Sequence, residues 1–405
     1  MLSNMRGPFM LSFHSIPLRQ RWFAPLRYLA SFATVVTSLA HGGEVEIVFH
    51  SSLDQSKQLA MAYVPAACRD KASPLLVVAH PMGGDRQTAK RLGYYEEAER
   101  RGWLVVCPDL HGHRSGGGTS LAAIEAQRDI LDAIDHMALI YRVDRSRVYL
   151  SGRSMGGMLA QIMAAKYPDR FACVVAGQAI SDLAAWSRSV TPSILGLIHA
   201  ECLPLSDETR FDYERRSSIR YAPNFAYVPL ILWHGSNDDT VPPEHSETLA
   251  KAIRHYNPRQ EPVRWLHGAG HNPINYPPRW ICDQLEHYVN TCDGAMRVRT
   301  RFYRALTLVV DEPCSIFWLT IEPATNQRFA EVRAAIREDV LTIHATGAKQ
   351  VSIDLDRLVA GISFSHLEIT ADATLVLAIK RGAETLFSFS CEQRFSGDIA
   401  LKPFD

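Results

Sequence analysis

The chain has 405 residues, which is longer than one average domain and favours two domains. Its hydrophobic content of 47% and charged content of 21% are those of an ordinary globular protein and exclude a disordered chain. Because 43 basic residues balance 43 acidic residues, no overall field indicates an anionic membrane or nucleic acid as a partner. We therefore expect no nucleic-acid partner.

The N-terminal 40 residues have the pattern of a secretory leader. Four arginines between residues 6 and 27 precede an uncharged stretch, Tyr28–Ala40, which ends in the small-x-small sequence Ser38-Leu39-Ala40. The stretch is shorter than the roughly 20 residues that a membrane span needs. Initiation at Met10 would shorten this long leader to about 30 residues. The pattern predicts a signal peptide over residues 1–40, export to the periplasm or the medium, and no integral membrane span after leader removal.

Residues 41–292 alternate short apolar runs with helical stretches. Continuous runs of Val, Ile and Leu are typical of strands buried on both faces of a parallel sheet. Helical candidates such as Ser120–Leu139 and Gly157–Lys166 lie between the runs. The alternation predicts an α/β domain with a doubly wound, mostly parallel sheet. The six runs are Leu75–His80, Leu104–Cys107, Val148–Ser151, Ala172–Ala176, Leu230–Trp233 and Val263–Leu266.

Residues 293–405 have a different texture, with closely spaced runs that often alternate apolar and polar side chains. This alternation is typical of half-buried antiparallel strands and predicts a small β-rich domain. Residues 331–338 fit a helix or a strand. The other runs are Ala305–Val310, Ile316–Ile321, Val340–His344, Val351–Leu355, Leu367–Thr370, Thr374–Ile379 and Thr385–Phe389.

A candidate nucleophile lies directly after the run that ends at Ser151. The sequence Ser151-Gly152-Arg153-Ser154-Met155-Gly156-Gly157 has the G-x-S-x-G spacing of a sharp turn from strand to helix. Such a turn exposes a serine hydroxyl, and the flanking glycines permit its strained backbone. The spacing alone also fits a turn without chemistry; its place between a strand and a helix favours Ser154 as a nucleophile.

An acid and a histidine follow the next strands in the order that this chemistry uses. His234-Gly235-Ser236-Asn237-Asp238-Asp239 comes after one run, and Gly268-Ala269-Gly270-His271 comes after the last. Both aspartates are of the right type; the spacing favours Asp238, with Asp239 as a solvated neighbour. The order Ser…Asp…His predicts a catalytic triad of Ser154, Asp238 and His271.

The loop His80-Pro81-Met82-Gly83-Gly84 after the first run is a candidate for the oxyanion hole. Such a hole takes one backbone N–H from this loop and one from the residue after the nucleophile. We therefore expect the backbone N–H groups of Met82 and Met155 to be the donors.

These stretches, together with Arg216-Ser217-Ser218-Ile219-Arg220-Tyr221-Ala222, resemble the catalytic domain of the prolyl oligopeptidase family and, near it, dienelactone-hydrolase-like and acetyl xylan esterases. The resemblance covers residues of about 70 to 290 and implies an α/β-hydrolase fold. It places the family's catalytic roles on Ser154, Asp238 and His271, and it implies no cofactor and no metal. Between Ala40 and the first core strand there is no room for the family's N-terminal β-propeller, and His-Pro stands where many esterases have His-Gly.

Three further segments admit two interpretations each. Asp109-Leu110-His111-Gly112-His113 fits a metal site or, as its match in the family favours, a loop that borders the pocket. Residues 115–118 are expected at the substrate rim, and Trp186–Glu208 fits a lid or a packed helical insertion. Among eight cysteines, none in a C-x-x-C pair, Cys282 with Cys292 or Cys314 with Cys391 are candidate bridges in an exported protein.

The resulting hypothesis is a serine hydrolase that cleaves carboxylic esters through an acyl-enzyme, on a small ester or one carried by a carbohydrate. The alternative within the same chemistry is a prolyl-oligopeptidase-like peptidase that acts on short peptides. A non-catalytic binding protein with a hydrolase-like fold is the third interpretation, and the intact triad sequence disfavours it.

Overall fold

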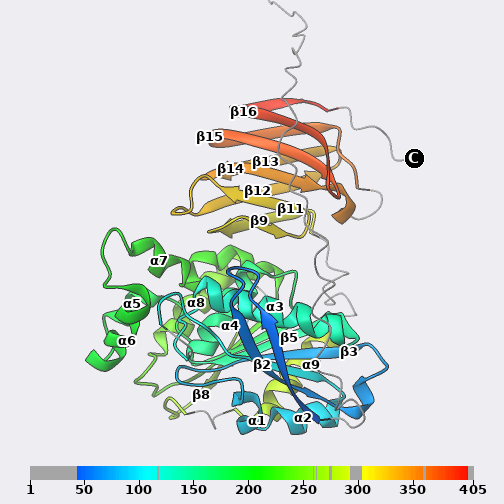
Figure 1. Cartoon of the computed structure of the whole chain (residues 1–405). Helices are drawn as coiled ribbons and strands as arrows, with labels where there is room; N and C mark the ends of the chain where they lie inside the picture. The colour runs from blue at the N-terminus through cyan, green and yellow to red at the C-terminus, as the bar shows by residue number, and fades with distance from the viewer. Residues whose placement is uncertain are drawn as a thin grey trace, which may run out of the picture. The chain divides into compact units, whose positions relative to one another are not determined.

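The computed structural model describes residues 43–115, 118–258, 260, 262–272, 276–291, 303–358 and 362–399. They build two sheets within the compact unit formed by residues 42–405 (Figure 1). The predicted leader and the predicted domain boundary at residue 292 lie outside the described residues. Among the helices that the structure describes, none is both long and apolar enough to cross a membrane.

The first sheet has eight strands in the order β1-β2-β4-β3-β5-β6-β7-β8. β1 pairs with β2 and β2 with β4 in antiparallel register, whereas all neighbours from β4 to β8 are parallel. The predicted mostly parallel sheet is thereby confirmed. Its strands are β1 (Gly43–His50), β2 (Lys57–Val64), β3 (Ser73–Ala79), β4 (Leu104–Pro108), β5 (Val143–Arg153), β6 (Cys173–Gly177), β7 (Leu230–Gly235) and β8 (Val263–Leu266).

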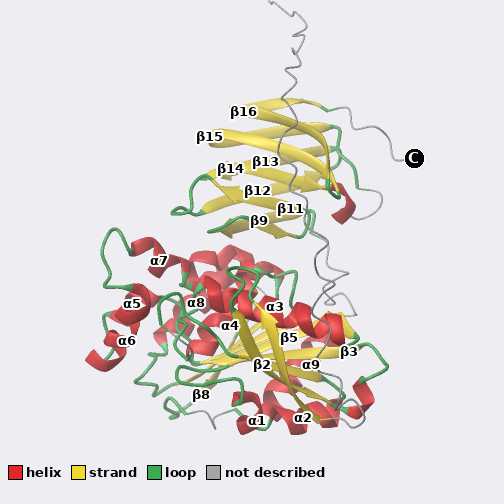
Figure 2. Ribbon diagram, in the orientation of Figure 1, coloured by secondary structure: helices red, strands yellow, loops and turns green. Residues whose placement is uncertain are grey.

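The central strands of this sheet are buried on both faces: every residue of β3 and β4 is buried, and successive side chains of a strand point to opposite faces. Leu75 and Val77 of β3 pack with α3, α4 and α8 in one core. Leu76 and Val78 pack with α2 and α9 in another, so helices cover both faces (Figure 2). The helices are α1 (Thr88–Leu92), α2 (Tyr94–Arg101), α3 (Ile124–Ile140), α4 (Met155–Lys166), α5 (Leu183–Ser187), α6 (Pro192–Cys202), α7 (Arg210–Arg215), α8 (Glu244–Tyr256) and α9 (Pro278–Thr291).

The second sheet has the order β10-β11-β14-β15-β13-β12-β9, with β16 paired to β15. Most neighbours are antiparallel as predicted, but β15 runs parallel to both β13 and β14. Residues 331–338, which fitted a helix or a strand, lie largely in β12. The strands are β9 (Ala305–Val310), β10 (Cys314–Ile316), β11 (Leu319–Pro323), β12 (Ala330–Arg337), β13 (Val340–Thr346), β14 (Ala348–Asp354), β15 (His366–Arg381) and β16 (Glu384–Asp398).

β9 of the second sheet lies against the 3₁₀ helix Ser218–Tyr227 of the α/β part. The Asn224 side chain accepts a hydrogen bond from Val309 N at 2.8 Å and donates to Val309 O at 2.9 Å, in the way a neighbouring strand would. Asn224 also donates to Ala165 O at 2.9 Å. The edge of the β-rich sheet is therefore satisfied by a buried amide rather than by another strand.

Candidate active site

Ser154 lies at the turn between β5 and α4, as predicted. Its backbone has φ of 57° and ψ of −124°, a conformation that side-chain-bearing residues rarely adopt. The strained turn holds because Ser154 N donates to Gly177 O on the neighbouring strand β6 at 2.9 Å, and Ser154 O accepts from Met158 N of α4 at 2.9 Å. The strain therefore sits on the residue that we expect to react.

Two glycines make this turn sterically possible. A Cβ at Gly152 would lie 2.2 Å from Gly156 O, and a Cβ at Gly156 would lie 2.2 Å from Ala79 O. Both contacts are with backbone atoms, which cannot move aside as a flexible side chain can. The G-x-S-x-G spacing is therefore a requirement for close approach of α4 to β5 and β3.

His271 follows β8 on a short loop and contacts both other predicted triad members. Ser154 Oγ donates to His271 Nε2 at 3.1 Å, and His271 Nδ1 donates to Asp238 Oδ2 at 2.8 Å. Two hydrogen bonds to its backbone hold this loop in place: Gln178 Nε2 donates to Gly270 O at 2.7 Å, and Asn237 N donates to Ala269 O at 2.9 Å. The structure thus brings Ser154, His271 and Asp238 together in one chain of hydrogen bonds.

Asp238, rather than Asp239, is the aspartate that reaches the histidine. It is 4% exposed, and its Oδ1 accepts from Val241 N at 2.9 Å and from Thr240 N at 3.1 Å. Burial opposes its ionisation, but hydrogen bonds from His234, His271 and Val241 outweigh burial and hold the pKa of Asp238 well below its usual range. The carboxylate is therefore fixed and ionised, whereas Asp239 is exposed.

Met155 and Met82, whose N–H groups are the predicted oxyanion donors, lie at the start of α4 and on the loop after β3. Met155 is the first residue of α4, so its N–H has no acceptor within the helix. Met82 lies on the loop after β3, and that loop is tied to its neighbours by Gly83 N, which donates to Gly118 O at 2.8 Å. The sequence reasoning missed a second tie: the buried His80 donates from Nδ1 to Pro81 O at 2.9 Å, and its Nε2 accepts from Leu110 N at 3.1 Å.

Burial lowers the pKa of His80, which keeps this ring neutral with one donor and one acceptor nitrogen. A neutral ring is what the two hydrogen bonds require, since Nε2 must accept while Nδ1 donates. His80 therefore belongs to the support of the loop and not to the triad.

A pocket of about 460 Å³ adjoins the nucleophile turn. Its wall includes Met82 and Gly83 of the oxyanion loop, Gly152 and Arg153 just before the nucleophile, and Trp233 at the end of β7. The rest of the wall is largely apolar and comes from α1, α2 and the start of α9. The lining includes the residues just before Ser154 but neither Ser154 nor His271, so the pocket adjoins the nucleophile turn from one side.

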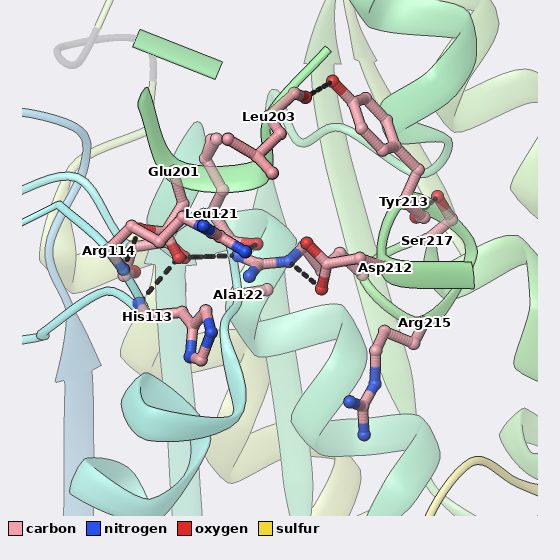
Figure 3. Close-up of polar contacts among 12 residues, drawn as sticks. His113, Arg114, Leu121, Ala122, Glu201, Leu203, Asp212, Tyr213, Arg215 and Ser217 are labelled. Carbon is pink, nitrogen blue, oxygen red and sulfur yellow. Dashed lines mark hydrogen bonds and ion pairs between the residues drawn. The ribbon is translucent and has the colours of Figure 1, made fainter. Parts of the chain in front are cut away.

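The segment Trp186–Glu208, which fitted a lid or a packed insertion, is packed through a buried ion pair. Glu201 of α6 is fully buried, and Arg216 Nη1 donates to its Oε1 at 3.0 Å (Figure 3). The backbone N–H groups of residues 113, 114 and 115 donate to the same carboxylate at 2.7, 3.0 and 2.9 Å. Arg216 Nε in turn donates to Asp212 at 3.0 Å. The predicted rim loop and the insertion are therefore joined by one carboxylate.

The histidines of the Asp109–His113 loop bind separate carboxylates of α3. His111 Nδ1 lies 2.8 Å from Asp129 Oδ2, and His113 Nδ1 lies 2.7 Å from Glu125 Oε1. Both rings are thus engaged by separate carboxylates, and none of residues 109–113 is among the described residues that line the pocket of about 460 Å³. The thiols of Cys282, Cys314 and Cys391 are free, so the candidate Cys314–Cys391 bridge is wrong; Cys292 lies outside the described residues.

The fold and the hydrogen-bonded site define an α/β-hydrolase. A model of the prolyl oligopeptidase family matches residues 98–293. An acetylxylan esterase from Coprinopsis cinerea is 26% identical over 50% of this chain and 54% of its own length. Human prolyl endopeptidase FAP is 21% identical over 57% of this chain and 31% of its own length.

Among solved structures, a puromycin-hydrolyzing peptidase of Mycobacterium tuberculosis has the same fold, with a TM-score of 0.50 and 21% identity over 61% of this chain and 39% of that one. The chain thus spans about half of the esterase and a third of the two peptidases. The predicted resemblance to the prolyl oligopeptidase catalytic domain and to acetyl xylan esterases is confirmed.

Proposed function

We propose that this chain hydrolyses carboxylic esters, with Ser154, His271 and Asp238 as its catalytic triad. The observation that carries the proposal is the continuous chain of hydrogen bonds from Ser154 Oγ through His271 to Asp238, at 3.1 and 2.8 Å. Similarity to an acetylxylan esterase supports esters as the substrate class. A small ester, free or on a carbohydrate, fits the neighbouring pocket of about 460 Å³.

In the first half of the reaction, Ser154 Oγ attacks the ester carbonyl carbon and passes its proton to His271 Nε2. Asp238 holds Nδ1–H of the ring and stabilises the imidazolium that forms. The carbonyl oxygen gains negative charge toward the N–H groups of Met82 and Met155. The C–O bond then breaks, and His271 gives its proton to the departing alcohol.

In the second half, His271 takes a proton from water, and the hydroxide oxygen attacks the acyl-enzyme carbonyl. The bond to Ser154 Oγ breaks, His271 returns the proton to Oγ, and the carboxylic acid is released. The groups already in place need no rearrangement between the halves, because the same nitrogen serves as base and then as acid.

A peptidase that acts on short peptides is the second candidate, because the matching family model and prolyl endopeptidase FAP point to it. The triad chemistry is the same, so only the leaving group separates the two. Turnover of p-nitrophenyl acetate without cleavage of proline-containing aminoacyl p-nitroanilides supports the esterase. The reverse pattern supports the peptidase.

Labelling with a fluorophosphonate probe tests the nucleophile itself. We expect the wild type to be labelled and Ser154→Ala to be unlabelled, because the probe bonds covalently to an activated serine. Labelling of Ser154→Ala at the wild-type rate would overturn the assignment.

We further propose that residues 41–292 are the catalytic domain, that residues 293–405 are an accessory domain, and that the protein is exported. The three proposed triad residues all precede residue 292, and the leader pattern of residues 1–40 supports export. A chain truncated after residue 292 that remains folded by circular dichroism should still turn over p-nitrophenyl acetate. Mass spectrometry of the protein from the periplasm or medium should find an N-terminus near residue 41.

A further inference from the structure

Arg153, the residue before the proposed nucleophile, lies in the pocket and has no direct ion pair, although the charge of Asp238 acts on it from a greater distance. Its Nη1 is buried and has no hydrogen-bond partner, and no ion pair involving Arg153 is found among the described residues. The buried Arg216, by contrast, meets the carboxylate of Glu201. A buried cation without a partner costs free energy, so its retention points to a ligand.

The indole of Trp233 supplies a second donor without a partner beside this cation. Arg153 of β5 is in register with Gly177 of β6, and Gly177 is in register with Trp233 of β7. All three positions therefore face the same side of the sheet, the side covered by α2 and α9. The Trp233 Nε1 atom is also buried without a hydrogen-bond partner.

Gly177, the position between them, allows the Trp233 indole to lie over β6. A Cβ at Gly177 would lie 2.0 Å from Cε2 and 2.4 Å from Nε1 of Trp233, so the indole covers the glycine and extends toward Arg153. Two N–H donors without partners thus border one pocket at the carboxyl end of the sheet. This arrangement requires glycine at position 177.

The charge of the pocket wall has one sign. The charged residues that line it are Arg153 and Arg91, and no carboxylate is among the described lining residues. Arg91 is already neutralised, because its Nη2 lies 2.8 Å from Asp85 Oδ1 and its side chain is 52% exposed. Arg153 is therefore the cation of this wall that has no direct ion pair among the described residues. Residues 273–275, which precede the lining residue Tyr276, are Pro, Ile and Asn and carry no acid.

Much of the remaining wall is apolar and aromatic. Trp233 and Tyr276 meet edge to face with ring centroids 5.1 Å apart, and Ile281 and Val78 complete the apolar lining. Such a wall suits an aromatic or other flat group, whereas the guanidinium suits an acceptor with negative charge at its end.

We propose that this pocket binds a carboxylate attached to a flat apolar group, held by Arg153 and Trp233, and that it selects substrates carrying such a group. Arg153 is thus a specificity-determining residue. The selection of substrates rests on the proposed ester hydrolysis at Ser154, whereas the binding of the carboxylate does not depend on it. A carboxylate would satisfy both donors at once.

The binding test compares benzoate with benzamide, its uncharged equivalent, by isothermal titration calorimetry on the full chain. We expect benzoate to bind about tenfold to a hundredfold more tightly, because a hydrogen bond to a charged group contributes that much. The preference should weaken as NaCl is raised. In Arg153→Met it should fall to about twofold or less, and in Arg153→Lys it should be intermediate.

Arg91→Met is the matched control. It removes a positive charge from the same wall, but this charge is already neutralised by Asp85. It should keep the preference for benzoate. Equal affinities for benzoate and benzamide in the wild type, or an unchanged preference in a folded Arg153→Met, would overturn the proposal. If Arg153→Met does not fold, the wild type still provides a test: a preference for benzoate that does not weaken as NaCl is raised would overturn the proposal.

The substrate test compares kcat/KM for 4-acetoxybenzoate with that for its methyl ester. We expect the wild type to favour the free acid and Arg153→Met to lose that preference by about tenfold or more. If the wild type hydrolyses both esters equally, substrate selection by Arg153 is wrong. If it hydrolyses neither but still prefers benzoate over benzamide, the proposed function has failed and the anion site stands.

Discussion

At the scale of single residues, the site depends on which of two adjacent aspartates is turned inward. Asp238 accepts hydrogen bonds from two backbone N–H groups of its own loop, and these bonds hold its carboxylate in place independently of His271. Asp239 is exposed, and its side-chain contact is with Thr240 Oγ1 at 3.4 Å. The loop therefore holds the carboxylate of Asp238 against His271, whereas the carboxylate of Asp239 is exposed to solvent.

Replacing each aspartate by asparagine should separate their roles. We expect Asp238→Asn to lower kcat for p-nitrophenyl acetate by about four orders of magnitude, because an amide favours the wrong tautomer of the histidine. Asp239→Asn should stay within about threefold of the wild type, since an exposed side chain far from the reacting atoms contributes little. A large loss in Asp239→Asn with an active Asp238→Asn would show that the assignment is reversed.

The sequence was sufficient to predict the three residues that the structure joins by hydrogen bonds, Ser154, His271 and Asp238, because each lies in a short motif at the end of an apolar run. It was not sufficient to find the roles of Trp233 or Gly177. These two residues are neighbours of Arg153 only through the register of β5, β6 and β7. That register comes from tertiary packing and cannot be read from the local sequence pattern. His80 belongs to the predicted oxyanion loop, but its supporting role could not be predicted. The hydrogen bond from Leu110 N joins two loops that are thirty residues apart in the sequence.

At the scale of elements, apolar runs located the buried parallel strands well. β8 coincides with the predicted run, and β4 and β7 differ from theirs at one end only. β1 and β2 were missed because they form an antiparallel hairpin at the sheet edge, where β1 alternates exposed and buried residues. Two predicted runs, 367–370 and 374–379, are one strand, β15, whose pairing with β16 shifts register between Thr370 and Thr374.

The insertion that carries α6 was ambiguous in sequence because a buried charge cannot be recognised without its partner. Glu201 and Arg216 lie on different elements, and the backbone of residues 113–115 supplies three further donors. Burial opposes the ionisation of Glu201, but the hydrogen bonds from Ser115 and the charge of Arg216 keep its pKa lowered. The pair thus fixes α6 to the loop beside the site.

Glu201→Gln should therefore destabilise the fold by about 3 kcal/mol, because removing one partner leaves Arg216 as a buried charge with reduced compensation. The measurement is the free energy of unfolding from urea titration. Glu208→Gln, an exposed position in the same segment, is the control and should leave the free energy of unfolding essentially unchanged. The double variant Glu201→Gln/Arg216→Met should lose less than the sum of its single changes. A simple sum would contradict a direct pair.

At the scale of the whole molecule, the two sheets meet through charges as well as through Asn224. Lys166 Nζ, at the end of α4, lies 2.8 Å from both Asp311 and Glu312, and Arg215 lies 2.7 Å from Asp311. The Lys166 side chain is 2% exposed and that of Asp311 is fully buried. Because α4 begins at the proposed nucleophile, the contact secures the far end of the helix whose first turn forms part of the site.

This contact makes stability depend on pH. Burial opposes the ionisation of Asp311, yet the charges of Lys166 and Arg215 outweigh burial and hold its pKa below the usual range. A carboxyl whose pKa is lowered by folding stabilises the folded state at pH values above its unfolded pKa of about 3.9. That contribution is lost as the pH falls below about 4 toward the lower pKa of the folded state.

Asp311→Asn should accordingly lower the free energy of unfolding at pH 7 by about 3 to 5 kcal/mol, because it leaves Lys166 and Arg215 with less compensation in a buried position. Urea titrations between pH 7 and pH 3 should show the gap between wild type and variant narrowing below about pH 4, where the wild-type carboxyl begins to protonate. Asp207→Asn is the matched control: its pair with Arg210 is 90% exposed at the carboxylate and should contribute little at any pH. A gap of constant size from pH 7 to pH 3 would mean that Asp311 acts through its shape rather than its charge. A gap that narrows as expected would identify the protonation of Asp311 as a step that loosens the β-rich sheet from the α/β part in acid.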